Sequence, residues 1–405
     1  MRITPVLLKQ HLGWHFYKHW VVQGKVKPLE TGATAILKSK GIPVYDPKDI
    51  ISEKRTIEKI QVIGERDLPQ PLDETHPNWH ETPLFKVGNN NVLLEGLNQA
   101  QIVTNSVKIA DDLPNKINVE ALPKSVDKVM KSIIMQSHVF DAEQKTLPKI
   151  KDPERPAWNF PRIYGISQER RNKIITHKLI NLLENTSDKD LAKQRYIFED
   201  LLFSYPFERN GQLAQLEVSG NVVMTSTKPL PPITNDSLES HNLPNIDPID
   251  PLITFTKEHI YELRNIYPIK STVKAHHPHT IFIHFDREFV KNLYEEEVTT
   301  EQIFGRSLLH TFTVAASYAR QKYGDGKTLD EPVTVQCVQT DGRIFHFGVL
   351  QLNTLNLLDA STKNVWYQTP LQYLFENCEY VKGKPVLEGY NNQIIQQLHS
   401  FYRNV

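Results

Sequence analysis

The segment from residue 333 to residue 354, VTVQCVQTDGRIFHFGVLQLNT, constrains the fold of this chain more than any other. Asp341-Gly342 separates two runs of β-branched, aromatic and aliphatic residues, which predicts a β-hairpin with a two-residue type I′ turn. With that turn, the register sets Cys337 opposite His346. Both faces of such a hairpin carry apolar side chains, so we expect it to lie in the middle of a sheet that is covered on both sides.

Two helices are predicted to cover this hairpin. The longer one begins with a possible capping box, Thr299 with Gln302, carries one apolar stripe and ends at Gly324, as the usual helix start and stop signals require. The second is expected near residues 391–402, and a strand is expected over residues 279–286 because apolar and polar residues alternate there.

The N-terminal half, residues 91–225, is predicted to be helical or mixed. Helical spacing of apolar residues begins near Val92, near Ser125 and near Ser167, and it continues through residues 191–202. The segment GQLAQLEVSGNVVMTST that follows predicts two short strands joined at Ser219-Gly220-Asn221.

Extended segments flank these parts. Residues 30–90 contain many turn signals and little periodicity, which predicts an arm that lies on a partner. Residues 226–252 contain six prolines and are expected to form a proline-rich linker to a C-terminal domain over residues 253–405. The predicted fold class is α+β: a largely antiparallel C-terminal sheet flanked by helices, a helical N-terminal half and long extended proline-rich arms.

The first 29 residues contain lysine, arginine, histidine and aromatic residues but no carboxylate, since the first acidic residue is Glu30. This composition is typical of a mitochondrial transit peptide. The alternative is a basic surface helix that stays with the protein. No uncharged apolar run reaches the ~18 residues that a bilayer crossing needs, so we expect no membrane span.

The overall charge gives no chain-wide attraction for nucleic acid. Lysine and arginine total 47, as do aspartate and glutamate, so any RNA contact is expected to be local. The chain has two cysteines, Cys337 and Cys378, which excludes a disulfide scaffold and a four-thiolate zinc site.

One local segment, residues 145–178, combines many cations with three aromatic side chains. Cations suit phosphates and flat rings suit base stacking, so this composition favours contact with RNA. The alternative is a helix from Ser167 with a solvated basic face, preceded by a proline-rich loop that the aromatic residues pack. The candidate RNA-contact residues are Arg155, Trp158, Phe160, Arg162, Tyr164, Arg170, Arg171 and Lys173.

Two other groups of residues contain side chains of the kinds found in metal sites or catalytic sites. The histidines of the segment HHPHTIFIH, residues 276–284, are close in sequence but lack a second ligand pair at matching distance, which argues against zinc. Cys337 and His346 could act as nucleophile and base, but positions in the middle of a covered sheet are closed to substrate. We therefore expect no catalytic residue, no metal and no cofactor, and no glycine-rich phosphate loop is present.

Several segments resemble one protein family. EPVTVQCVQTDGRIFHFGVLQLNT, with SYARQKYGDGKTLDEP before it, closely resembles the C-terminal signature of the mitochondrial large-subunit ribosomal protein thirty-seven family. HETPLFKVGNNNVLLEGLNQAQIVT, DDLPNKI, STKPLPPI and PHTIFIHFD are similar to the same family in the same order. The resemblance covers roughly residues 80–354.

This resemblance implies a structural, non-enzymatic protein of the large subunit of animal mitochondrial ribosomes, located in the mitochondrial matrix. It implies contacts with other large-subunit proteins, including a homologous partner subunit, and with large-subunit rRNA. Two alternatives remain: a soluble mitochondrial metal-dependent enzyme, or an assembly factor that binds the ribosome transiently.

Overall fold

The computed structural model describes residues 16–25, 31–46, 72–149, 154–155, 157–158, 161, 163–234, 242–292, 296–324, 326, 328–359 and 361–405. The chain divides into two units, Met1–Gln70 and Pro71–Val405. In the first unit, residues 16–22 are helical and α2 spans Ala33–Ser39 without a buried side chain. Most of the predicted transit peptide, residues 1–15 and 26–29, lies outside the described residues.

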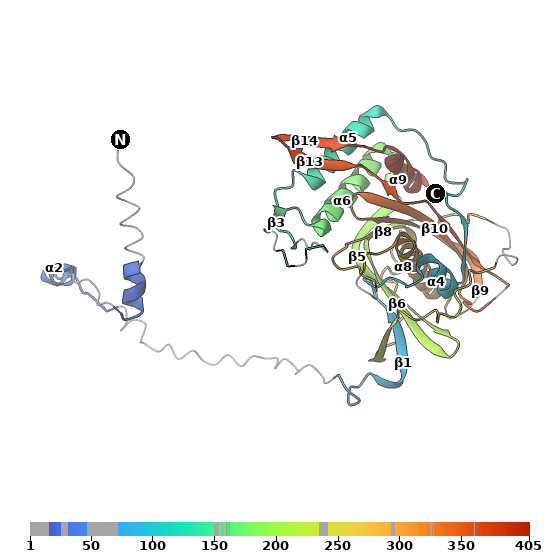
Figure 1. Cartoon of the computed structure of the whole chain (residues 1–405), viewed down its shortest axis with the longest axis horizontal. Coiled ribbons are helices and arrows are strands. Elements are labelled where there is room, and N and C mark those ends of the chain that lie inside the picture. Colours follow the sequence, from blue (N-terminus) through green and yellow to red (C-terminus); the bar gives the residue numbers. More distant parts are fainter. Residues whose placement is uncertain are drawn as a thin grey trace. The chain divides into compact units, whose positions relative to one another are not determined.

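The second unit is built around one large mixed sheet (Figure 1). The hairpin strands β9 and β10 lie inside it, as predicted, with β11 on one side and β8 on the other. Along the sheet the strands are β2 (Ser106–Ala110), β11 (Asn364–Gln368), β10 (Ile344–Thr354), β9 (Thr328–Thr340), β8 (His277–His284), β6 (Gln212–Ser226), β1 (Trp79–Val87) and β7 (Thr256–Ile260); β5 (Arg195–Arg209) pairs with β6, and β12 (Gln372–Tyr373) pairs with β10.

The predicted turn of the hairpin is wrong. Cys337 pairs with Gly348 instead of with His346, and residues 341–344 lie between the paired Thr340 and Phe345. A type I′ turn needs positive φ at both central residues, and of Asp341 and Gly342 only the glycine, at 90°, has it. The register is therefore displaced by two residues, and because this number is even, every side chain stays on the face predicted for it.

One face of the sheet is covered by α8 (Thr300–Tyr323), the helix predicted from its capping box, which is present. The side chains of Phe304 to Ala319 along this helix are all buried. α4 (Gly96–Thr104) crosses α8 at Gly96 and Gly305, where two glycines allow the two backbones to meet. This side of the sheet holds one core cluster, which includes Cys337.

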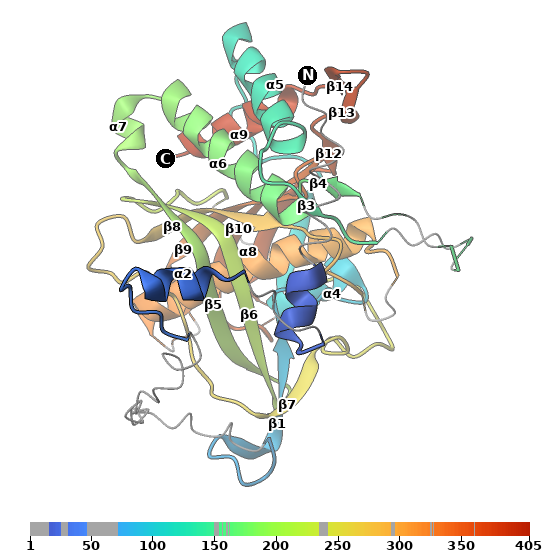
Figure 2. The same cartoon turned by 90° about the vertical axis from the view of Figure 1, so that its left-hand side faces the viewer.

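The other face is covered by α5 (Lys124–His138), α6 (Gln168–Thr186) and α9 (Gln393–Arg403), as Figure 2 shows. Their apolar side chains pack with the hairpin in a second core cluster. The ring centroids of Phe347 and Phe401 are 5.4 Å apart in an edge-to-face contact. The prediction that a C-terminal helix covers the hairpin from the second side is thus confirmed.

The N-terminal half contains more strand than the sequence predicted. Residues 195–202, expected to continue a helix, form the first part of strand β5, and β6 runs without interruption through Gly220. The turn lies earlier, at Asn210-Gly211, where φ is 49° and 78°. Part of the expected arm, residues 79–87, is strand β1.

Short elements complete the unit. The proline-rich segment from residue 226 contacts the sheet, because Leu230 bridges to Thr334 of β9.

No helix among the described residues is long and apolar enough to cross a membrane. The remaining elements are β3 (Lys145–Thr146), β4 (Tyr164–Gly165), α7 (Lys189–Ala192), β13 (Asn377–Val381) and β14 (Lys384–Glu388).

Candidate nucleic-acid interface

The predicted RNA-contact residues fall on a loop, a short strand and the start of α6. Trp158 is 59% exposed and Tyr164, on β4, is 70% exposed, while Arg155 is exposed in the loop between β3 and β4. Two candidates, Phe160 and Arg162, lie outside the described residues. The three candidates before α6 that the structure describes therefore present a cation and two rings to solvent.

The cations at the start of α6 already have acidic partners. Arg170 donates from Nε to Asp141 Oδ2 at 2.8 Å, and its Nη1 lies 2.8 Å from Glu143 Oε2. Lys173 Nζ lies 3.2 Å from Glu199 Oε2. These exposed or half-exposed ion pairs contribute little stability, but each carboxylate lowers the local positive potential that would attract a phosphate.

Arg171 is half-buried instead of directed to solvent. Burial lowers the pKa of its guanidinium, and the nearby Cys378 acts in the opposite direction. Among the described residues its Nε has no hydrogen-bond partner. The sequence predicted the charge at this position but not its burial against the base of the β13–β14 hairpin.

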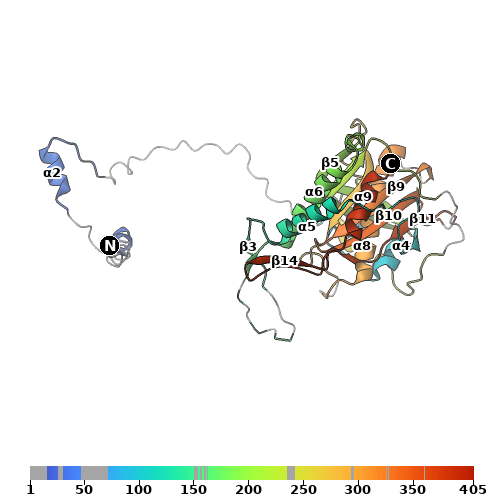
Figure 3. The same ribbon diagram turned by 90° about the horizontal axis from the view of Figure 1, so that it is seen from above.

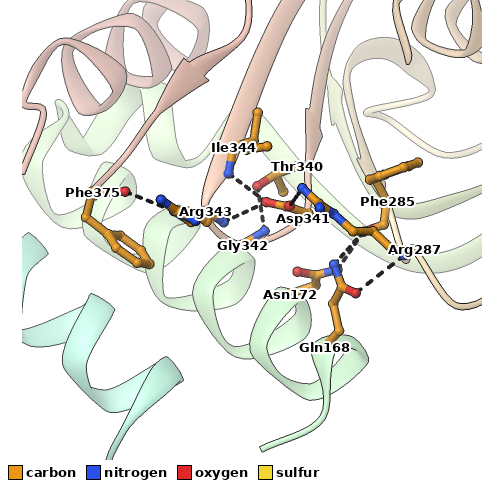
Figure 4. A network of polar contacts seen from close by, with 10 residues as sticks. All are labelled: Gln168, Asn172, Phe285, Arg287, Thr340, Asp341, Gly342, Arg343, Ile344 and Phe375. Carbon is orange, nitrogen blue, oxygen red and sulfur yellow. Dashed lines mark hydrogen bonds and ion pairs between the residues drawn. The ribbon is translucent and has the colours of Figure 1, made fainter. Parts of the chain in front are cut away.

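The start of α6 is hydrogen-bonded to the turn that follows β8. Gln168 Nε2 donates to the carbonyl of Phe285 at 3.1 Å, and the Arg287 amide donates to Gln168 Oε1 at 3.4 Å (Figure 4). A Cβ atom at Gly342 would lie 2.9 Å from Asn172 Oδ1. The tip of the central hairpin thus packs directly against the first turns of α6.

The hairpin tip is organised by the Asp341 carboxylate. Its Oδ1 accepts the amides of Arg343 at 2.9 Å and Ile344 at 2.6 Å (Figure 4). Gly342 donates its amide to Thr340 Oγ1 at 3.0 Å. A side chain that satisfies two backbone donors stabilises a longer turn than the two-residue turn that Asp-Gly usually makes.

A buried polar cluster lies between α8 and the hairpin. His346 Nδ1 is 2.8 Å from Ser307 Oγ, and burial lowers the pKa of this imidazole to about 3. Burial raises the pKa of the Cys337 thiol to about 12. Both side chains are fully buried, so near neutral pH this pair holds a neutral imidazole and a protonated thiol, the opposite of an activated nucleophile.

Arg306 belongs to the same cluster. Its Nη1 donates to Gln339 Oε1 at 3.1 Å and its Nη2 donates to the carbonyl of Asn89 at 3.1 Å. Burial lowers the pKa of this guanidinium to about 10. These hydrogen bonds join α8 to the hairpin and to the loop before α4, which is a structural use of the charge.

The four histidines near β8 are bound to different neighbours. His277 Nδ1 lies 2.6 Å from Tyr318 Oη, His279 Nε2 lies 2.9 Å from the carbonyl of Asn404, and His284 Nε2 lies 3.0 Å from Thr176 Oγ1. His276 Nδ1 is 3.0 Å from the carbonyl of Val273. In the described part of the chain no three histidine, cysteine or acidic side chains converge as metal ligands would.

A set of cations that the sequence analysis passed over lies on α5. The helix was predicted for its apolar stripe, and Val126, Met130, Ile133 and Ile134 are indeed buried. Lys124, Lys128 and Lys131 are exposed, and their spacing of four and three residues places them on one face of the helix. The spacing of these three lysines was the feature of the sequence that could have identified them as one row.

Comparisons with known proteins identify relatives of the chain. Residues 300–405, from α8 onward, match the family described as "Mitochondrial 28S ribosomal protein S30 (PDCD9)". "Large ribosomal subunit protein mL37" of Rattus norvegicus is 28% identical over 337 residues, which cover 78% of this chain and 73% of that protein. The mL37 protein of Bos taurus is 28% identical over 338 residues (80% and 74%), and that of Gallus gallus is 25% identical over 337 residues (78% and 72%).

The two comparisons differ in the subunit that they name, since the matched family carries a 28S description and the relatives a large-subunit one. The mL37 similarity extends over about three quarters of the chain, whereas the family match covers the last 106 residues. The chain is thus similar to large ribosomal subunit protein mL37 over about three quarters of its length, and the family resemblance predicted from its sequence is confirmed.

Proposed function

We propose that the chain is a structural component of the mitochondrial large ribosomal subunit, where it supports mitochondrial translation through contacts with neighbouring proteins and local contacts with rRNA. The observation that carries this proposal is the similarity to mL37 proteins over 76–80% of the chain in three mammals and at 78% in a bird. The protein acts in the mitochondrial matrix, and its neighbours include a homologous partner subunit.

The buried side chains support a role without catalysis. The imidazoles of β8 and the thiol of Cys337 contact other groups of the same fold, and burial keeps His279, with a pKa of about 3, neutral. An enzyme instead places such groups at a substrate cleft with pKa values near the working pH. The charge-balanced chain also fits a component that meets mainly other proteins.

The exposed residues Arg155, Trp158 and Tyr164 of the predicted RNA-contact segment, called the RNA-contact strip below, form the proposed local RNA contact. Arg155 supplies a cation, and Trp158 and Tyr164 supply rings on which unpaired bases can stack. Phe160 and Arg162 keep the same proposed role from the sequence. The helix that follows these residues, α6, is held against its neighbours by Arg170, Arg171 and Lys173. The charges of these three side chains are paired or half-buried.

Co-sedimentation tests this proposal. The tagged chain, expressed in animal cells, is expected in the mitochondrial large-subunit fraction of a sucrose gradient prepared in salt that strips loosely bound factors. Quantitative mass spectrometry is expected to give a one-to-one ratio with other large-subunit proteins. A transient assembly factor would be substoichiometric in mature particles. Recovery of the chain only in the soluble fractions would refute the proposal.

A further inference from the structure

The positive charge of this neutral chain is concentrated in one stretch of the sequence. Between residues 124 and 178 lie 12 of the 47 lysines and arginines but only 6 of the 47 acidic residues. The segment is therefore positive by six charges and the rest of the chain is negative by the same amount. The cations are Lys124, Lys128, Lys131, Lys145, Lys149, Lys151, Arg155, Arg162, Arg170, Arg171, Lys173 and Lys178.

Both long helices of this segment, α5 and α6, lie side by side on the same face of the sheet (Figure 3). Lys178 of α6 donates to Gln136 Oε1 of α5, which links the polar sides of the two helices. On α6 the first cations are paired with acids, as described above. Among the described residues, the exposed cations of the segment outside α6 therefore lie in two places: on α5, at Lys124, Lys128 and Lys131, and between α5 and α6, at Lys145, Lys149 and Arg155.

Three lysines form a row on α5. At 1.5 Å of rise per residue, Lys124, Lys128 and Lys131 are separated by about 6 Å and about 4.5 Å along the axis, and their side chains point within about 60° of one another. Neither Lys124 nor Lys128 has a carboxylate within ion-pair distance among the described residues. Lys131 Nζ lies 5.1 Å from the centre of the Tyr390 ring.

The acid within this row is already engaged. Asp127, one turn before Lys131, accepts a hydrogen bond from Tyr390 Oη at 2.9 Å. Lys124 is also the first residue of the helix, where the helix dipole disfavours a positive charge. The Lys124 charge thus weakens the first turn of α5 in the isolated protein, which is expected of a side chain that serves a negatively charged partner.

We propose that the lysine row Lys124, Lys128 and Lys131 on α5 binds the phosphate backbone of double-helical RNA. The one ring described beside the row, Tyr390, is half-buried and is held by its hydrogen bond to Asp127, so the three aligned ammonium groups read charge and spacing more than bases. The row thereby complements the Arg155–Tyr164 strip, whose rings suit unpaired bases. This inference rests on the proposed function, because it names the part of the ribosome that the α5 face contacts.

Salt-dependent binding tests the row directly. The full chain and the variant K124Q/K128Q/K131Q are titrated against a fluorescein-labelled 20-base-pair RNA duplex by fluorescence anisotropy from 50 to 300 mM KCl. Each lost phosphate contact removes roughly 0.7–0.9 from the slope of log K against log salt, so the slope is expected to fall by about 2–3. At 100 mM KCl the same change weakens binding about 100-fold.

The control variant K257Q/K270Q/K274Q removes the same charge from exposed lysines outside the segment and is expected to keep the wild-type slope. Circular dichroism checks that both variants are folded. An unchanged slope in the α5 variant, an equal loss in both variants, or a wild-type chain that does not bind the duplex would overturn the inference.

Sedimentation separates this inference from the proposed function. A wild-type chain absent from the large subunit contradicts the proposed function itself. If the wild-type chain co-sediments and the α5 variant loses its place in the particle but still binds the duplex normally, the row faces an acidic protein, and the RNA inference is wrong while the proposed function stands.

Discussion

Gly305 in α8 is the position where the addition of one methyl group is expected to disturb the fold most directly. A Cβ atom there would lie 2.5 Å from the carbonyl carbon and oxygen of Gly96 and 3.0 Å from the Leu97 amide nitrogen. These are backbone atoms of α4, so no side-chain rotation can relieve the overlap. A methyl carbon ordinarily lies about 3.5 Å or more from another heavy atom. The two helices, α4 and α8, must therefore separate by about 1 Å.

The expected cost follows from two opposing terms. Forcing an extra methyl group into a packed core costs about 1–3 kcal/mol, and more where backbone must move. Alanine in place of glycine inside a helix returns about 0.5–1 kcal/mol. Gly305→Ala is therefore expected to lower the free energy of unfolding by about 1–2 kcal/mol.

Two measurements separate the overlap from helix propensity. Urea unfolding followed by circular dichroism is expected to give a lower midpoint for Gly305→Ala than for the wild-type protein. A synthetic peptide of residues 300–323 is expected to become more helical with the same substitution, since α4 is absent. A protein variant as stable as wild type, or more stable, would refute the close contact between α4 and α8.

Three other predictions follow from buried groups. Gly348→Ala is expected to destabilise the protein in urea, because its methyl group would overlap the buried ring of Trp366, and the cost should shrink in a Trp366→Leu background. Stability is expected to be nearly constant between about pH 7 and about pH 8 and to fall below about pH 6.5, by about 1.4 kcal/mol per histidine at pH 5.5, since the unfolded chain gains protons that the folded chain excludes; pH-dependent urea titration measures this, and a stability unchanged between pH 7.5 and 5.5 would contradict it. The histidines with a pKa of about 3 are His279, His284 and His346. Iodoacetamide at pH 7.5 is expected to leave Cys337 unmodified in the folded protein and to alkylate it in urea, as mass spectrometry can show; rapid modification of the native protein would mean that the thiol is accessible.

The hairpin illustrates how much of this fold the sequence could predict. Alternating apolar residues predicted both strands, their burial on two sides and the helices that cover them. The turn was wrong because Asp341 uses its side chain to hold two amides, and a local dipeptide preference does not include that competition. The same preference did succeed at a site that was overlooked: Asn210-Gly211 makes the two-residue turn between β5 and β6, and Asn-Gly is its strongest signal.

The errors in the N-terminal half have a related cause. Ile197, Phe198, Leu201 and Leu202 recur at spacing that also fits a helix, but they pair along β6 in a strand. Short apolar runs are ambiguous between the two structures, and tertiary pairing decides between them. Gly220, which suggested a turn, lies inside β6, where a Cβ atom would come within van der Waals contact of Ile281 on the neighbouring strand.

The RNA-contact strip shows a different limit. The sequence correctly located exposed rings at Trp158 and Tyr164, since both are solvent-exposed. It could not predict that Asp141, 29 residues before Arg170, returns to pair with that arginine. Charge counted along a sequence is therefore a poor measure of charge available to a partner when acids from other elements fold back onto the cations.

The two faces of the sheet have different uses, and this difference limits where a partner of stated chemistry can bind. α8 is buried along almost its whole length by α4 and by strands of the sheet, including β5 and β6, and its exposed polar residues lie only at its two ends, at Thr300, Glu301, Gln321 and Lys322. α5 has only five buried side chains in fifteen residues, and its lysines point outward. A polyanion can therefore bind to the layer formed by α5 and α6 but not along the buried length of α8. Of the two layers of helices that cover the sheet, the α5–α6 layer is therefore the one that presents cations to such a partner, together with the loop that joins its two helices.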